Sequence, residues 1–172
     1  FPAHLPNGHI VPALLAGNAV VFKPSEKTPA VGQMMVDLYR EAGIPEGVIR
    51  ICHGLGDVGR ALVVHPDIDG VLFTGSAHTG IAINRALAAR PDRIAALEMG
   101  GNNPIVAWDT ADMQNTATLI VQSAFLSAGQ RCSNARRLIV RDTMAGPLLD
   151  AVRKLTDRLI VGHPFDDPQP YM

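Results

Sequence analysis

The 172-residue chain is 47% hydrophobic and 18% charged, which is enough apolar material to bury a sizeable core. Its formal net charge of −1 leaves no basic surface of the kind that binds nucleic acid or an anionic membrane. No apolar run approaches the roughly 18 residues of a membrane span, and two distant cysteines and six scattered histidines form neither a disulfide framework nor a metal motif. These features predict a cytoplasmic protein without a metal site, and the missing initiator methionine leads us to expect a part of a longer polypeptide.

The first hundred residues alternate between short strand patterns and helical patterns. Gly17 stops an apolar helical stretch, and Thr28-Pro29 is typical of the N-cap and first residue of a helix that Gly43 ends. Further helices are predicted at 57–65 and 79–90. Strands are predicted at the short apolar runs 19–22, 48–52, 70–74 and 93–97. Strands that alternate with helices through short connections indicate a parallel sheet of the α/β class.

After Gly101 the alternation starts again. Strands are predicted at 104–108 and 137–140, and helices at 112–128 and 147–160. We therefore expect two consecutive units, the first over residues 1–97 and the second over residues 98–172.

Two glycine-rich turns are candidates for binding the phosphates of a nucleotide. Residues 54–59 match the dinucleotide pattern G-x-G-x-x-G between a strand and a helix, but no acidic residue follows about 20 positions on. Residues 75–80 also join a strand to a helix, and Ser76 or Thr79 can cap a helix N-terminus that attracts a pyrophosphate. The residues alone leave both turns open, and either can be an ordinary connection.

Lys23 and Glu26 follow the end of a predicted strand, where open α/β sheets bind ligands. A lysine can donate to ribose hydroxyls, and a carboxylate can accept from the adenosine 2′-hydroxyl. Because a carboxylate would repel a 2′-phosphate, Glu26 favours NAD over NADP. On the residues alone, a solvated surface ion pair, worth ~0–1 kcal/mol, is the better explanation of these two residues.

Glu98 and Cys132 are the candidates for covalent chemistry. Cys132 lies in a loop between a predicted helix and a predicted strand, and the nearby cations Arg131 and Arg136 favour the reactive thiolate. Glu98 ends a predicted strand just before two glycines, which leave room for water and substrate beside a general base. Taken alone, a single cysteine is more often structural, and the glutamate can instead cap a helix or join a salt bridge.

Together these segments resemble the aldehyde dehydrogenase superfamily over essentially all 172 residues. Five motifs carry the resemblance in chain order: Phe-Pro at 1–2, Lys-Pro-Ser-Glu at 23–26, Phe-Thr-Gly-Ser at 73–76, Glu-Met-Gly-Gly at 98–101 and Gly-Gln-Arg-Cys at 129–132. The local phrases at 5–10, 98–104 and 131–137 are most similar to the branch that oxidises N-succinylglutamate 5-semialdehyde in arginine catabolism.

The resemblance implies a Rossmann-like NAD-binding domain over 1–97 and the first part of a catalytic domain over 98–172, both incomplete. It implies that Cys132 attacks an aldehyde and that Glu98 activates the water that hydrolyses the resulting thioester. It also implies that NAD lies against the turn at 75–80, with 54–59 nearer the adenine. The residues that it assigns to NAD are Lys23, Ser25, Glu26, Gly75, Ser76, Ala77, His78, Thr79 and Gly80.

The implied enzyme is a homo-oligomer that acts on a small-molecule aldehyde and has no nucleic-acid or membrane partner. Relatives carry an oxyanion-binding asparagine directly before the Phe-Pro pair, a position that precedes Phe1. The backbone N–H of Cys132 is then the remaining oxyanion donor, so we expect residues 1–172 alone to be almost inactive. Three alternatives remain: an aldehyde dehydrogenase with another substrate, an acyl-reducing relative that runs the thioester chemistry in reverse, and a nucleotide-binding module without turnover.

Overall fold

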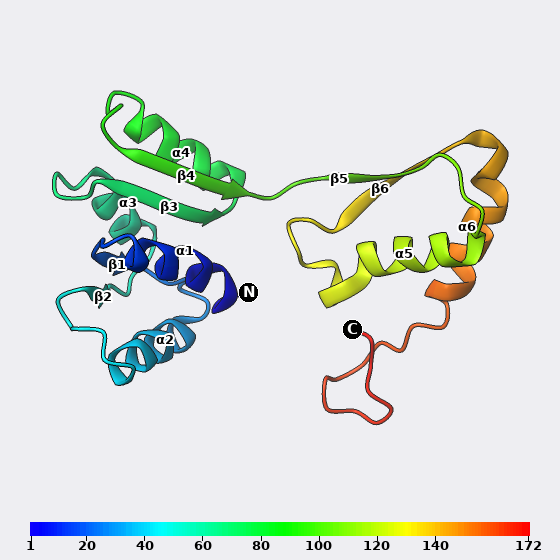
Figure 1. Cartoon of the computed structure of the whole chain (residues 1–172), viewed down its shortest axis with the longest axis horizontal. Coiled ribbons are helices and arrows are strands. Elements are labelled where there is room, and N and C mark those ends of the chain that lie inside the picture. The colour runs from blue at the N-terminus through cyan, green and yellow to red at the C-terminus, as the bar shows by residue number, and fades with distance from the viewer. The chain divides into compact units, whose positions relative to one another are not determined.

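The computed structural model describes all 172 residues, and the chain divides into two compact units, Phe1–Met99 and Gly100–Met172. Both are built from parallel strand pairs and helices, so the predicted α/β class with parallel pairing is confirmed (Figure 1). The strands pair two by two instead of forming one continuous sheet. No helix combines the length and the apolar character that crossing a membrane would require. The roles of the two units as NAD-binding and catalytic domains stay predictions.

The first unit alternates helices and strands from its start. Its elements are α1 (His4–Leu15), β1 (Val20–Phe22), α2 (Pro29–Glu41), β2 (Ile49–Ile51), α3 (Gly56–Val64), β3 (Gly70–Gly75), α4 (Ala77–Leu87) and β4 (Ile94–Met99). Gly17, with φ +83°, follows the end of α1, and Pro29 begins α2, as predicted. The Thr28 side chain, however, makes no capping hydrogen bond. α4 begins at Ala77, two residues before the predicted start, because Ser76 is its N-cap.

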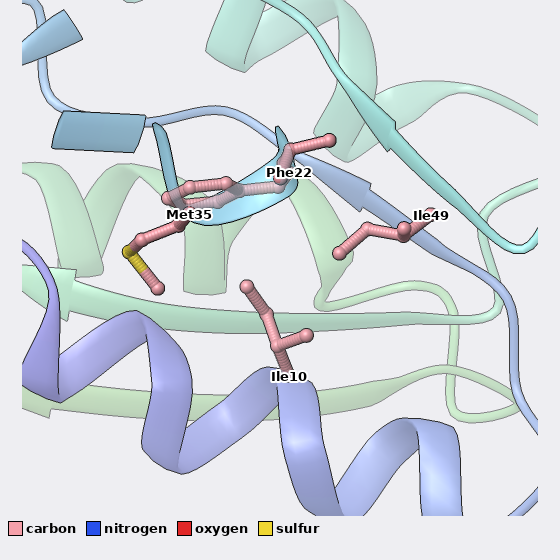
Figure 2. Close-up of a cluster of buried hydrophobic side chains, with 5 residues drawn as sticks. Ile10, Phe22, Met35 and Ile49 are labelled. Atoms are coloured by element: carbon pink, nitrogen blue, oxygen red, sulfur yellow. The ribbon is translucent and has the colours of Figure 1, made fainter. Parts of the chain in front are cut away.

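Two separate apolar clusters hold the first unit together. In the first, α1 and α2 pack on the β1–β2 pair, and Figure 2 shows Ile10 pointing from α1 toward Phe22, Met35 and Ile49. In the second, α3 and α4 pack on the β3–β4 pair through Val63, Ile83, Leu87, Val71, Phe73 and Leu97. Each parallel pair therefore has its own core, formed with its own two helices.

The second unit contains β5 (Asn103–Ala107), α5 (Met113–Phe125), the 3₁₀ turn η1 (Leu126–Gly129), β6 (Ala135–Val140) and α6 (Asp142–Thr156). Its core surrounds Ala117 and Leu148, which are fully buried. The predicted helix over 112–128 ends earlier, because the backbone of Ser127 and Ala128 is left-handed, with φ of 58° and 55°. The predicted start at Pro147 is wrong: α6 begins at Asp142, whose carboxylate suits a helix N-terminus, and includes the proline.

Candidate active site

The segment that contains Lys23, Ser25 and Glu26 leaves the carboxyl end of β1 and is held by α2. A Cβ on Gly32 would lie 2.5 Å from Pro24 Cβ, so the helix packs directly on this proline. Ser25 Oγ accepts from the Lys27 N–H at 3.3 Å. The Glu26 side chain is exposed and makes no hydrogen bond or ion pair within the chain. A carboxylate in that state is free to accept a hydrogen bond from a ligand.

Lys23 connects this segment to the other glycine-rich turn. Its side chain is half-buried, and Nζ donates to the Pro24 carbonyl at 2.9 Å. A Cβ on Gly59 of α3 would lie 3.5 Å from Lys23 Cε, so the lysine stem runs alongside the first turns of α3. No ion pair joins Lys23 to Glu26. The structure therefore brings Lys23 to the end of the 54–59 turn and does not show the surface ion pair that the residues alone allow.

The turn at 75–80 presents a capped helix N-terminus. Ser76 Oγ accepts from the Thr79 N–H at 3.2 Å and contacts Thr79 Oγ1 at 3.0 Å. Ala77 and His78 are exposed residues of the first turn of α4, and their amides have no acceptor within the chain. Exposed N–H groups at the positive end of a helix are a suitable site for a pyrophosphate.

Close packing explains the two glycines of this turn. A Cβ on Gly75 would lie 2.5 Å from Phe73 Cζ, and one on Gly80 would lie 2.5 Å from Met99 Sδ. Both positions therefore require a small residue. The turn lies directly against the Phe73 ring and against β4, the strand that carries Glu98.

Glu98 is the fifth residue of β4 and is exposed. It is paired in register with Thr74 of β3, and paired residues of parallel strands point to the same face. Thr74 Oγ1 is also 3.2 Å from Nε2 of His9, which comes from α1. Sequence reasoning missed His9, since no local pattern relates it to a residue 65 positions away. Glu98 therefore lies next to a side-chain contact between α1 and β3.

Cys132 lies, as predicted, in a loop between a helix and a strand, here η1 and β6, and the structure shows that it is exposed. The Asn134 amide is 4% exposed, accepts from the Arg131 N–H at 2.6 Å and donates to the Ser123 carbonyl at 2.7 Å. Asn103 Nδ2 donates to the carbonyl oxygens of Cys132 and Asn134. The sequence did not single out either asparagine, because asparagines are common in loops. Asn103 and Asn134 differ from other loop asparagines only in their burial and their hydrogen-bond partners, which the structure reveals.

The two arginines beside Cys132 bind the left-handed turn that precedes it. Arg131 Nε donates to Ser127 Oγ at 3.1 Å, and Arg136 Nη2 donates to the Gly129 carbonyl at 3.1 Å. They therefore help to shape the loop, a role that the charge argument from sequence did not anticipate. Glu98 belongs to the first unit and Cys132 to the second.

Known proteins are similar to this chain over almost its whole length. Residues 1–171 match the profile described as "Aldehyde dehydrogenase family". The chain is 68% identical to the N-succinylglutamate 5-semialdehyde dehydrogenase of Sphingopyxis alaskensis and 66% identical to that of Novosphingobium aromaticivorans. Each alignment includes 100% of this chain and 36% of the relative, so the chain spans about a third of the length of these curated relatives.

Solved structures of dehydrogenases also superpose on almost the whole chain. A variant of Thermus thermophilus 1-pyrroline-5-carboxylate dehydrogenase superposes with a TM-score of 0.90 at 35% identity, covering 98% of this chain and 34% of that one. A 1-pyrroline-5-carboxylate dehydrogenase from Thermus with bound NAD superposes with a TM-score of 0.85 at 37% identity, covering 94% of this chain and 32% of that one. The chain belongs to the aldehyde dehydrogenase family.

Proposed function

We propose that the complete polypeptide carrying this sequence oxidises an aldehyde to a carboxylate with NAD, using Cys132 as nucleophile and Glu98 as general base. The observation that carries the proposal is the exposed thiol of Cys132 in a loop whose backbone is hydrogen-bonded on both sides, in a chain of this family. The identity to relatives named N-succinylglutamate 5-semialdehyde dehydrogenase supports that semialdehyde as the substrate. The proposed pathway, arginine catabolism, follows from the sequence resemblance alone.

The first unit contains groups that fit NAD. The free amides of Ala77 and His78 suit the pyrophosphate, and Lys23 and Glu26 supply a donor and an acceptor for the adenosine ribose. The exposed Glu26 carboxylate would repel a 2′-phosphate, which supports NAD over NADP. When bound, NAD supplies the acceptor for the hydride. The NAD complex of a structural neighbour supports the same cofactor.

The reaction that we propose uses the protein groups in a fixed order. The Cys132 thiolate forms a carbon–sulfur bond to the aldehyde carbon, and the carbonyl π electrons move to the oxygen. The Cys132 N–H, which has no acceptor within the chain, can donate to that oxyanion. Loss of hydride from the same carbon restores the carbonyl and leaves a thioester on Cys132.

Glu98 completes the cycle by hydrolysis. Its exposed carboxylate takes a proton from a water molecule, and the water oxygen bonds to the thioester carbon. The carbon–sulfur bond then breaks, the electron pair returns to sulfur, and the carboxylic acid leaves. The general base is required for this second half and not for the first.

The proposal that Glu98 acts in thioester hydrolysis and not in thioester formation can be tested with Glu98→Gln in the complete polypeptide. We expect one stoichiometric burst of NADH and then a steady-state turnover reduced by about 10²–10⁴-fold, because the thioester forms but is not hydrolysed. The exposed Glu46, substituted as Glu46→Gln, is the matched control and should turn over normally. Undiminished steady-state turnover of Glu98→Gln would refute the role of this glutamate. Alkylation of Cys132 no faster than that of the half-buried Cys52 would count against the nucleophile.

A further inference from the structure

Two asparagine side chains, Asn103 and Asn134, hold the loop that carries Cys132, and we call them the asparagine clasp. Asn134 is almost fully buried, and both ends of its amide are used. Its oxygen accepts from the Arg131 N–H, and its nitrogen donates to the carbonyls of Ser123 and Leu126 at 2.7 and 3.4 Å. A buried amide is costly unless it is hydrogen-bonded, so this side chain specifies one loop conformation. It ties the residue before Cys132 to the end of α5.

Asn103 approaches the loop from the other side. It lies at the start of β5, where the pairing with β6 shifts: Asn103 pairs with Ala135, and Pro104 pairs with Arg137. An irregularity of this kind in a strand pair redirects the neighbouring side chains. Asn103 Nδ2 donates both to the Cys132 carbonyl and to the Asn134 carbonyl, the latter at 3.2 Å. The two asparagines therefore form one connected network around Cys132.

The segment before Cys132 adopts a backbone that L-residues rarely occupy. Ser127, Ala128 and Gly129 are left-handed in succession, with φ of 58°, 55° and 66°. The Gln130 N–H donates to the Ser127 carbonyl at 3.1 Å, and two arginine side chains bond to the same turn. Such strain persists only where the surroundings over-determine the conformation, and it is common at functional sites. The asparagine clasp and this turn together fix the approach to Cys132.

The hydrogen bonds fix the peptide groups on both sides of Cys132. The Arg131 carbonyl accepts from the Asn134 N–H at 3.2 Å, and the Cys132 carbonyl accepts from Asn103. In a trans peptide the N–H points opposite to the preceding carbonyl. The Cys132 N–H is therefore directed away from Asn134, and it has no acceptor within the chain.

We propose that the asparagine clasp positions the Cys132 peptide group so that its N–H meets the oxygen of the substrate carbonyl as that oxygen gains charge. The proposal rests on the proposed function of Cys132 as the nucleophile. Asn103 and Asn134 are positioning residues, since they act through the Cys132 backbone and not on the substrate. An oxyanion donor works only when it is held in place before the charge develops.

Two reactions of the same thiol separate positioning from general disruption. Addition to an aldehyde creates an oxyanion, whereas alkylation by iodoacetamide displaces iodide and creates none. Since losing a whole oxyanion donor costs ~10²–10³ in rate, we expect Asn103→Ala to lower kcat of the complete polypeptide by about 10–100-fold. The KM for NAD and the rate of Cys132 alkylation should remain within about threefold of the original values. The dependence of that alkylation rate on pH should keep its shape, because the thiol itself is unchanged.

Two further variants keep the test decisive. Asn103→Asp preserves the shape of the side chain but removes its donor, so it should show the same split even if Asn103→Ala folds poorly. Asn134→Asp keeps the acceptor for the Arg131 N–H and loses the donor to the carbonyls of Ser123 and Leu126, so its kcat should also fall. Asn115→Ala, an exposed asparagine of α5 whose side chain makes no hydrogen bond, is the matched control and should leave both reactions unchanged.

Three results would overturn the proposal. The first is a kcat within about twofold of the original in all the clasp variants. The second is an alkylation rate that falls in proportion to kcat, since the asparagines would then only support the fold of the loop. The third is turnover that survives Cys132→Ser, which would refute the proposed function itself. A Cys132→Ser variant without turnover, combined with unaffected clasp variants, would refute the asparagine clasp alone.

Discussion

The contribution of Arg93 to the stability of α3, the helix that Lys23 contacts at Gly59, can be tested quantitatively. Its guanidinium is buried and donates to three backbone carbonyls at the end of α3: Val63 at 3.0 Å, His65 at 2.7 Å and Pro66 at 3.2 Å. The last carbonyls of a helix have no partner within the helix, and a cation there also complements the helix dipole. Arg93 therefore anchors the end of α3 at the start of β4.

The expected cost of Arg93→Met follows from these bonds. Three hydrogen bonds from a charged donor, at about 1.5 kcal/mol each, give a loss of ~4–5 kcal/mol. Arg93 Nε, however, is buried without a partner, and removing that group returns ~1–3 kcal/mol of its desolvation penalty. The net loss is about 1–4 kcal/mol, and its midpoint changes the equilibrium for local opening by roughly 10²-fold.

Hydrogen exchange followed by mass spectrometry measures this change locally. The amides of α3 should lose protection by roughly 10²-fold in Arg93→Met, while those of α6, in the other unit, serve as an internal reference. Arg85→Met, an exposed arginine of α4, is the matched substitution and should leave α3 unchanged. A loss of protection in α3 below about threefold, or an equal loss in α6, would refute the anchoring role.

Two further predictions concern the turn at 75–80 and the response to acid. Gly75→Ala places a Cβ 2.5 Å from Phe73 Cζ, and relieving this overlap, at a cost of ~1–3 kcal/mol, requires the turn to move. If the proposed NAD site includes the amides of this turn, that movement weakens NAD binding by the complete polypeptide roughly tenfold, as measured by calorimetry. Unchanged affinity, as expected for Gly146→Ala, where the Cβ has open space, would contradict this reasoning. The hydrogen bond from Arg90 lowers the pKa of Asp92 from its ordinary value of 3.8 to about 2. Asp92 therefore contributes stability above its unfolded-state pKa that is lost as pH falls from about 4 to about 2; an NMR titration midpoint near 3.8 would be inconsistent with the pair.

Several helix ends could be predicted from the sequence, because the signals that mark them act over a few residues. Gly17 and Pro29 mark helix ends in the structure as predicted, because a positive φ and a fixed φ act on the adjoining residues. Ser76, which the sequence left open with Thr79 as a cap, is the N-cap of α4, so the predicted start at Thr79 is two residues late. The same rules misplaced the start of α6 at Pro147. A preference for the first helical turn does not prevent a proline from lying deeper in a helix whose packing is set by Leu148.

The end of α5 shows why longer-range contacts escape such rules. Ser127 and Ala128 are not helix breakers, and nothing nearby in the sequence requires a left-handed backbone. That conformation is held by side chains from beyond Cys132, including Arg136 and the buried Asn134. Their contribution depends on burial and direction, which a residue pattern does not contain.

The amino-acid sequence by itself determined the α/β alternation, the family and the identity of the candidate reactive groups, Glu98 and Cys132. Reactive groups are properties of residue types, and the motifs around them are short and contiguous. Only the tertiary structure decided which groups surround them, because those contacts join residues far apart in the chain. His9 reaches Thr74 across 65 positions, and Asn103 reaches the Cys132 carbonyl across 29. The chemistry that we propose for Cys132 depends on such contacts, since a peptide N–H becomes a useful oxyanion donor only when the fold holds it in one direction.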